Sequence, residues 1–289
     1  MRTLIGSACA VVALGCAEPL PIPPQPRDAD VAFASDSVSF AFDRTGTTLW
    51  PPGLYVGRTD SSTLHLLALN GGDPSWSPDR KTVVFVKFYA ETLARVDVAS
   101  GSVQAMVTTG ENLAPSWSPD GSLIAFSSSQ NNGTPPGLWI INDTGGIARR
   151  VPLPGPLRSE MDDPSWSPDG HYIVVSEDDR LFRTDTLGVD TAWITSPGVL
   201  DISPAWSPRG NWIAYVRTLP AGGYGTLWLI HPDGTGDHQI ADTALTPGWT
   251  FDGARVAFTR VGHGETALWS VDTLGHGLAR LTSPAHAPP

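Results

Sequence analysis

Cysteine is nearly absent from this 289-residue sequence, which contains only Cys9 and Cys16, both close to the N-terminus. If a leader is removed before Cys16, one thiol remains and no internal disulfide can form. Metal-ligand spacing is also missing, because none of the seven histidines belongs to a His-x-His or His-Glu-x-x-His pattern. The Gly-x-Ser-x-Gly pattern of a nucleophile elbow does not occur. We therefore expect no metal, no cofactor and no serine-hydrolase nucleophile.

Positive charge is scarce as well. There are 18 Lys and Arg against 29 Asp and Glu, which gives a formal net charge of −11. Nucleic acid is therefore excluded as a partner, since phosphate binding needs a basic face.

No segment after the leader has enough consecutive apolar residues for a transmembrane helix. The 30 Gly and 27 Pro recur at intervals, which is typical of a folded chain with many turns.

Residues 1–16 are predicted to be a signal peptide. A positive start at Arg2 precedes the apolar stretch Thr3–Leu14, which is too short to span a bilayer. Its end, Ala13-Leu14-Gly15-Cys16, resembles a bacterial lipobox, although Ala13 and Leu14 depart from the usual residues. The resemblance implies a lipid on Cys16; the alternative is an ordinary secretion signal with an incidental cysteine.

Residues 17–30 are predicted to be a proline-rich tether. The stretch Glu18–Arg27 has five prolines in ten residues, which favours an extended polyproline II conformation. Such a stiff segment would hold a domain away from a lipid surface, or it would serve as a docking motif for a partner.

A phrase of the form Pro-x-Trp-Ser-Pro-Asp-Gly recurs with a period of 40 to 49 residues. It contains the tryptophans Trp76, Trp117, Trp166, Trp206 and Trp249. Such a period signals repeated supersecondary units. The first proline suits the start of a strand, and Ser-Pro-Asp-Gly indicates a type I turn. Four aspartates are explained as turn formers in this phrase: Asp79, Asp120, Asp169 and Asp252.

The residues that follow each tryptophan predict four strands per repeat. Seven and nine residues after the tryptophan stand apolar residues, as at Ile124 and Phe126, and this alternation indicates a strand with one buried face. A sixth, degenerate copy is expected if Val31 replaces the tryptophan, because the same offsets then reach Val38 and Phe40. We therefore predict an all-β protein, a six-bladed β-propeller of four-stranded antiparallel blades over residues 31–283, with a tail at 284–289.

The repeated phrase resembles that of the TolB-type, or WD40-like, β-propeller family, over about residues 31–282. The resemblance implies the propeller fold. TolB itself carries an additional N-terminal α/β domain for which this sequence has no room, so the resemblance identifies a fold more securely than a role.

A second set of acidic residues stands just before the predicted first strands. The innermost strand of each blade lines the channel of a propeller, so these carboxylates are predicted at one channel mouth, where they would attract a cation, a basic peptide or a basic protein. The alternative is that they serve solubility and strand-end capping. The residues are Asp73, Glu111, Asp162, Asp163, Asp201 and Asp242.

We predict a non-catalytic, monomeric lipoprotein exported to the periplasmic face of the cell envelope, anchored in the outer membrane through Cys16. Its propeller would act as an interaction scaffold for another envelope protein or a peptide, including a basic one. The alternatives are a sugar- or peptide-processing lyase or hydrolase, or a glycan-binding module, with the site at the channel mouth.

Overall fold

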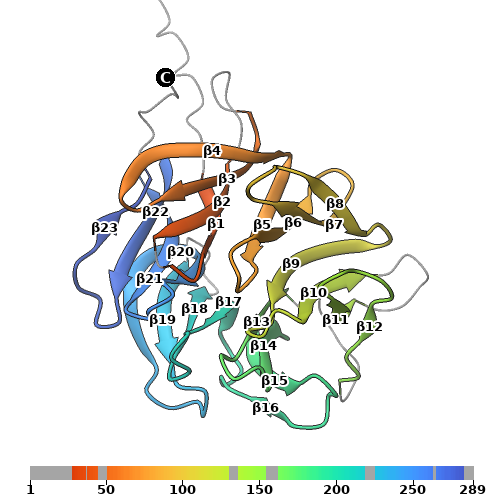
Figure 1. The fold of residues 1–289 in the computed structure, drawn as a ribbon. Helices are drawn as coiled ribbons and strands as arrows, with labels where there is room; N and C mark the ends of the chain where they lie inside the picture. Colours follow the sequence, from red (N-terminus) through yellow and green to blue (C-terminus); the bar gives the residue numbers. More distant parts are fainter. Residues whose placement is uncertain are drawn as a thin grey trace, which may run out of the picture.

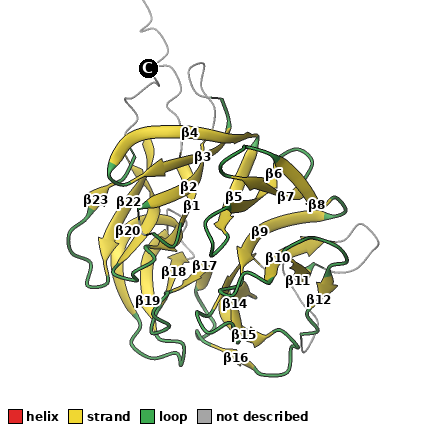
Figure 2. Cartoon of the chain, in the orientation of Figure 1, coloured by secondary structure: helices red, strands yellow, loops and turns green. Residues whose placement is uncertain are grey.

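The computed structural model describes residues 28–36, 38–44, 51–129, 136–153, 162–218, 225–262 and 265–282. These residues form strands and turns without a helix (Figure 2). Within these ranges there is consequently no helix long and apolar enough to cross a membrane.

The strands group into consecutive antiparallel sheets, which we call blades. Blade 1 contains β1 (Asp28–Phe33), β2 (Ser39–Arg44), β3 (Gly53–Arg58) and β4 (Ser61–Leu69). Blade 2 contains β5 (Gly71–Trp76), β6 (Thr82–Lys87), β7 (Thr92–Asp97) and β8 (Val103–Val107). Blade 3 contains β9 (Glu111–Trp117), β10 (Leu123–Ser129), β11 (Gly137–Asn142) and β12 (Arg149–Arg150). Blade 4 contains β13 (Asp162–Trp166), β14 (Tyr172–Glu177), β15 (Arg180–Asp185) and β16 (Thr191–Trp193).

The last two blades share one long strand. A seven-stranded sheet contains β17 (Leu200–Trp206), β18 (Ile213–Thr218), β19 (Gly225–Ile230), β20 (His238–Trp249), β21 (Arg255–Gly262), β22 (Glu265–Asp272) and β23 (Ala279–Arg280). The twelve-residue β20 pairs with β19 at its start and with β21 at its end, so it is the outer strand of blade 5 and the inner strand of blade 6. Figure 1 shows the blades arranged around a centre, with the first strand of each blade innermost. The prediction of an all-β propeller is confirmed, and the sheets fit six four-stranded units.

A hydrophobic cluster lies between each pair of neighbouring blades. Five of the six clusters contain the repeat tryptophan of the following blade, packed against the middle strands of the preceding blade. Large aromatic side chains fill such interfaces because each one buries much apolar area. The sixth cluster joins Ala257 and Leu268 of blade 6 to Phe40, Phe42 and Tyr55 of blade 1. Because every blade is built from consecutive strands, the described ring closes through this side-chain packing.

The register predicted for blade 1 was wrong. Phe33, rather than Val31, occupies the position of the repeat tryptophan, since it pairs with Phe40 as Trp76 pairs with Val83. The Ala34 amide also donates to the Ser39 carbonyl, as in the turns of the other blades. A strand alternates with a period of two, so a shift of two residues leaves the same face buried and the apolar pattern cannot detect it.

The predicted turns of the repeat phrase form as expected. In blade 3 the Ser118 hydroxyl donates to Asp120 over 2.6 Å, and the Ser122 amide donates to the same carboxylate oxygen over 3.0 Å. These hydrogen bonds lower the pKa of Asp120 from its usual 3.8, and the equivalent bonds do so for Asp79, Asp169 and Asp252. The aspartate of the phrase therefore stabilises the turn locally.

Candidate functional site

One residue of each innermost strand adopts a left-handed backbone conformation three positions before the tryptophan or its equivalent. Its φ lies between 32° and 54° in all six blades, and each inner strand has a break in pairing register there. Such a bulge leaves one residue unpaired and re-aims its side chain. Proline follows the bulge in blades 2 to 6 and suits it, since proline needs no hydrogen bond from its nitrogen. The bulged residues are Asp30, Asp73, Ala114, Asp163, Ser203 and Thr246.

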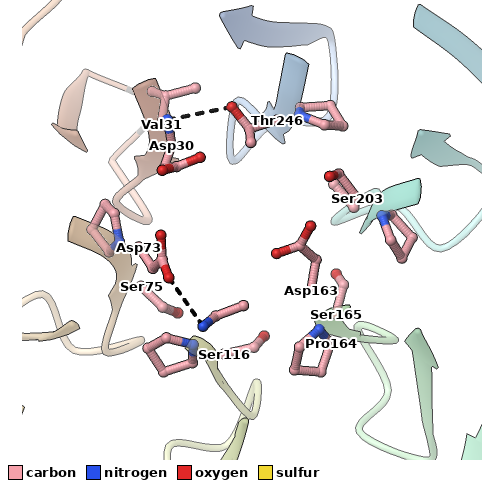
Figure 3. A pocket seen from close by; sticks show the side chains of 16 residues that line it. Asp30, Val31, Asp73, Ser75, Ser116, Asp163, Pro164, Ser165, Ser203 and Thr246 are labelled. Atoms are coloured by element: carbon pink, nitrogen blue, oxygen red, sulfur yellow. Dashed lines mark hydrogen bonds between the residues drawn. The ribbon is translucent and has the colours of Figure 1, made fainter. Parts of the chain in front are cut away.

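These bulged residues surround a central cavity of about 170 Å³. Figure 3 shows the carboxylates of Asp30, Asp73 and Asp163 directed toward this space, Asp30 and Asp73 from one side and Asp163 from the other, where Ser203 also lies. Ligand pockets for small molecules usually have about 300–1,000 Å³. The cavity is therefore suited to a few water molecules, an ion or one inserted side chain rather than to an entire small molecule.

The channel carboxylates are held by neighbouring blades. The Asp73 carboxylate accepts a hydrogen bond from the Ala114 amide over 3.2 Å, and Asp163 is hydrogen-bonded to Ser203. The Asp30 amide donates to the Thr246 hydroxyl over 3.3 Å, across the junction of blades 1 and 6. Asp30 is also hydrogen-bonded through its side chain to Asp73 and to a further carboxylate, Asp43 at the end of β2. Two of the three channel acids thus touch another acid.

The channel raises the pKa of two of its acids. Burial raises the pKa of Asp163 from 3.8 to about 6, against the hydrogen bond from Ser203, and the charge of Asp73 raises it further. Burial also raises the pKa of Asp30 well above its usual value, with added repulsion from Asp43 and Asp163. A site that holds carboxyl groups in this way favours a cation, because a nearby positive charge stabilises their ionised forms.

The structure separates the six acids predicted at the channel mouth. Of the five whose side chains the structure describes, only Asp73 and Asp163 line the channel. Glu111 is exposed and accepts from Ser129, while Asp242 is exposed and accepts from Gln239. Asp201 is fully buried and forms a two-bond ion pair with Arg217, at 2.7 and 3.0 Å. Of Asp162 only the backbone is described, and it pairs with Ser176 in the sheet.

The reason for this separation is the position of the bulge. The acids that line the channel stand three places before the tryptophan or its equivalent, whereas Asp201 and Glu111 stand five and six places before it. The set predicted from sequence therefore mixed residues at different depths along the strand.

Asp30 is the channel acid that the sequence prediction missed. Placing Val31 at the tryptophan position put Asp30 outside the expected strand, although it stands three places before Phe33 as Asp73 stands before Trp76. The Phe33–Phe40 spacing of seven residues is the sequence signal that could have found it.

Two other expectations concern parts of the chain beyond this channel. Cys16 lies outside the described residues, so its lipidation is not tested. Among the residues that the structure describes, no three His, Cys, Asp or Glu side chains form a group that could hold a metal ion.

The fold and the channel together define a β-propeller with a narrow, carboxylate-lined centre. Residues 69–245 match the family described as the TolB beta propeller domain. This match covers more than half of the sequence, so the chain belongs to the TolB-type propeller family.

Among its relatives, the Tol-Pal system protein TolB of Gluconobacter oxydans is 31% identical over 197 residues, which cover 64% of this chain and 41% of that protein. An uncharacterized protein of Agrobacterium fabrum is 26% identical over 242 residues, 68% of this chain and 75% of that one. The chain therefore spans less than half the length of the Gluconobacter TolB.

Solved structures show the same fold. TolB from Acinetobacter baumannii superposes with a TM-score of 0.71 at 19% identity, covering 90% of this chain and 64% of that one. An oligogalacturonate lyase in complex with manganese has a TM-score of 0.63 at 14% identity, covering 90% and 78%. At these identities the likeness shows the fold alone, which hosts both TolB and enzymes.

Proposed function

We propose that this protein is a cell-envelope interaction scaffold whose channel mouth binds a basic segment of another exported protein. The observation that carries the proposal is the convergence of Asp30, Asp73 and Asp163 on a cavity of about 170 Å³. A cavity of this size has room for one lysine or arginine side chain. The net charge of −11 also attracts a basic partner over a longer range.

The carboxyl groups make this binding depend on pH. Asp163, with a pKa of about 6, is protonated in acid and ionised above neutrality. A cationic side chain binds the ionised form, so binding strengthens as the pH rises through about 6 and releases protons.

The test uses affinity capture of partners from the protein's own membranes, after which the captured protein is titrated against purified scaffold. The variant carries Asp30→Asn, Asp73→Asn and Asp163→Asn, and we expect it to bind at least about tenfold more weakly, since charge-assisted hydrogen bonds are lost. The matched control carries Glu111→Gln and Asp242→Asn, which remove exposed acids outside the channel. Equal binding by both variants, or binding that weakens between pH 5 and 7.5, would refute the channel as the site.

We propose the periplasmic face of the outer membrane as its location, with a lipid on Cys16 and residues 17–30 as a tether. Support comes from the lipobox-like sequence, the proline-rich segment and membership of a family that includes a Tol-Pal system protein. Metabolic labelling with a palmitate analogue should mark the wild type and leave the Cys16→Ser variant unmarked. Light scattering of the protein without its lipid should give the mass of a monomer.

A second candidate is a lyase or hydrolase with its site in the channel. The specific observation in its favour is the pair of raised pKa values, because carboxyl groups with pKa values raised by burial are typical of general acid–base catalysis. Turnover of oligosaccharides or peptides that is lost in Asp163→Asn would favour this candidate over the scaffold.

A further inference from the structure

A second and larger cavity, of about 540 Å³, lies between blades 1 and 2. It opens beside the turns that join β1 to β2 and β5 to β6, and it shares no residue with the central channel. Its volume falls within the range of ordinary small-molecule sites, about 300–1,000 Å³.

A contact that the later blades make with their preceding blade is missing beside this cavity. In blades 4, 5 and 6, a turn glycine after the third strand stands against the preceding blade. A Cβ added to Gly188, Gly234 or Gly275 would lie 1.7, 2.9 or 3.0 Å from a main-chain oxygen of that blade. In blades 2 and 3, no atom lies within 4 Å of a Cβ added to Gly101, Gly145 or Gly146. At the Gly101 turn the described residues of blade 2 do not reach blade 1.

A strained arginine stands at the rim of this cavity. Arg80 has a φ of 63°, at the position where the other repeats have Gly121, Gly170, Gly210 and Gly253 in the same left-handed conformation. A side chain with a Cβ is unfavourable there, and glycine is the residue that adopts this conformation without cost. Strain of this kind is retained mainly at sites of function.

The guanidinium of Arg80 is only loosely paired. Its recorded ion pair, with Asp36, is 3.7 Å long. That carboxylate already accepts hydrogen bonds from the Val38 amide and from both the amide and the hydroxyl of Ser39. The neighbouring Arg58, by contrast, is held by Asp60 through two hydrogen bonds of 2.9 and 2.8 Å. Arg80 is therefore the cation of this cavity that has donors to offer a ligand.

A buried indole also lines the cavity. Trp76 is 9% exposed, and its Nε1–H has no hydrogen-bond partner among the residues that the structure describes. In Trp166 and Trp249 the same group donates to a carbonyl of the preceding blade, over 3.1 and 2.9 Å. A buried donor without an acceptor is unfavourable, so the packing of blade 2 against blade 1 is less complete here than at those two tryptophans. Trp117 shares this lack of a partner but does not line the cavity.

Ala34, Val56 and Val98 form an apolar part of the wall beside the tryptophan, and Ser39 and His65 also line the cavity. The other lining carboxylate, Asp79, is engaged by Ser77 and Lys81 in its own turn. We propose that the cavity between blades 1 and 2 binds a small organic anion, with its carboxylate, sulfonate or phosphate on Arg80 and an apolar ring against Trp76, Val56 and Val98.

The test measures binding of naphthalene-1-acetate to the full mature chain by isothermal titration calorimetry. We expect a dissociation constant of about 1 mM or tighter, as ordinary ligand efficiency gives for a probe of this size. Naphthalene-1-acetamide, the neutral analogue, should bind at least about tenfold more weakly because it lacks the charge-assisted hydrogen bonds.

Arg80→Gly separates binding from folding. It restores the residue of the other repeats, so the melting temperature should rise while affinity for naphthalene-1-acetate falls at least about tenfold. Lys87→Ala, which removes a positive charge from an exposed site outside the cavity, should leave that affinity unchanged. Val98→Phe should reduce the binding of both probes by filling the space. Equal affinity of the acid and its amide, undiminished binding by Arg80→Gly, or no binding of either probe would each overturn the proposal.

Discussion

The Asp163→Asn variant should be more stable than the wild type at neutral pH, although it loses a charged residue. In the folded protein Asp163 has a pKa of about 6, above its usual 3.8. A group with a raised pKa contributes stability that is fully present below its unfolded value and is lost as the pH rises through its folded value. The wild type therefore loses stability between about pH 4 and pH 6, and the asparagine variant does not lose this contribution.

The size of the effect follows from the difference between the pKa of Asp163 in the folded protein and its usual value. The interval between 3.8 and about 6 corresponds to about 3 kcal/mol at neutral pH. Asp163 is half-buried, so solvent screening reduces this figure, and we expect a gain of about 1–3 kcal/mol. The asparagine side chain retains an oxygen that can accept from Ser203, which limits the loss of hydrogen bonding. For a domain of this size the gain raises the melting temperature by about 2–4 °C per kcal/mol.

Calorimetric melts of wild type and variant at half-unit steps from pH 4 to pH 7.5 provide the measurement. The two curves should meet near pH 4 and separate through pH 6. Asp242→Asn is the control, because it removes an exposed carboxylate outside the channel. The reasoning fails if Asp163→Asn melts below the wild type at pH 7, or if its pH dependence is parallel to that of the wild type.

Three further outcomes can be measured by urea unfolding. Trp166→Ala should lower the free energy of unfolding by about 3–5 kcal/mol, since it removes the side chain that fills the interface of blades 3 and 4. The side chain of Trp193 is 45% exposed, so Trp193→Ala should lower it by about 1 kcal/mol or less. Similar losses in the two variants would contradict the interface role of Trp166. Arg217→Ala should cost about 3–5 kcal/mol because it leaves the buried Asp201 carboxylate without its cation, so a loss below about 1 kcal/mol would show that the pair is dispensable. Asp120→Ala should lower the free energy of unfolding by about 1 kcal/mol at pH 7. The hydrogen bond from Ser118 lowers the pKa of Asp120, so the stability that Asp120 contributes is present above its usual pKa of 3.8 and is lost as the pH falls. The free energies of unfolding of variant and wild type should therefore converge in acid.

The propeller was predictable because its units are local and repeated. The tryptophan phrase, its turn and the alternating strand after it all lie within about 20 residues, so the local structure of each copy can be predicted from that copy alone. The recurrence of this four-stranded unit in five copies then indicated a propeller. The degenerate first copy shows the limit, since alternation alone could not distinguish Val31 from Phe33.

The channel acids were predictable only in part. Asp73 and Asp163 carry the signal of an acid three places before a repeat tryptophan, and both line the channel. Asp201 is the same type of residue, yet it is buried and paired with Arg217, sixteen residues away in the chain. Which acid turns inward depends on the bulge, a backbone feature that residue type alone does not reveal.

The sequence by itself determined the class of fold, the order of the strands and the turns of each blade, because these depend on contacts between residues near one another in the chain. The tertiary structure decided what the ring brings together. Asp30 and Asp163 are 133 positions apart and meet only because the blades close around a centre. The cavity beside Arg80 and Trp76 is likewise lined by residues of blades 1 and 2 together. Proximity between distant segments, and the space left between them, comes from packing, which no single repeat encodes.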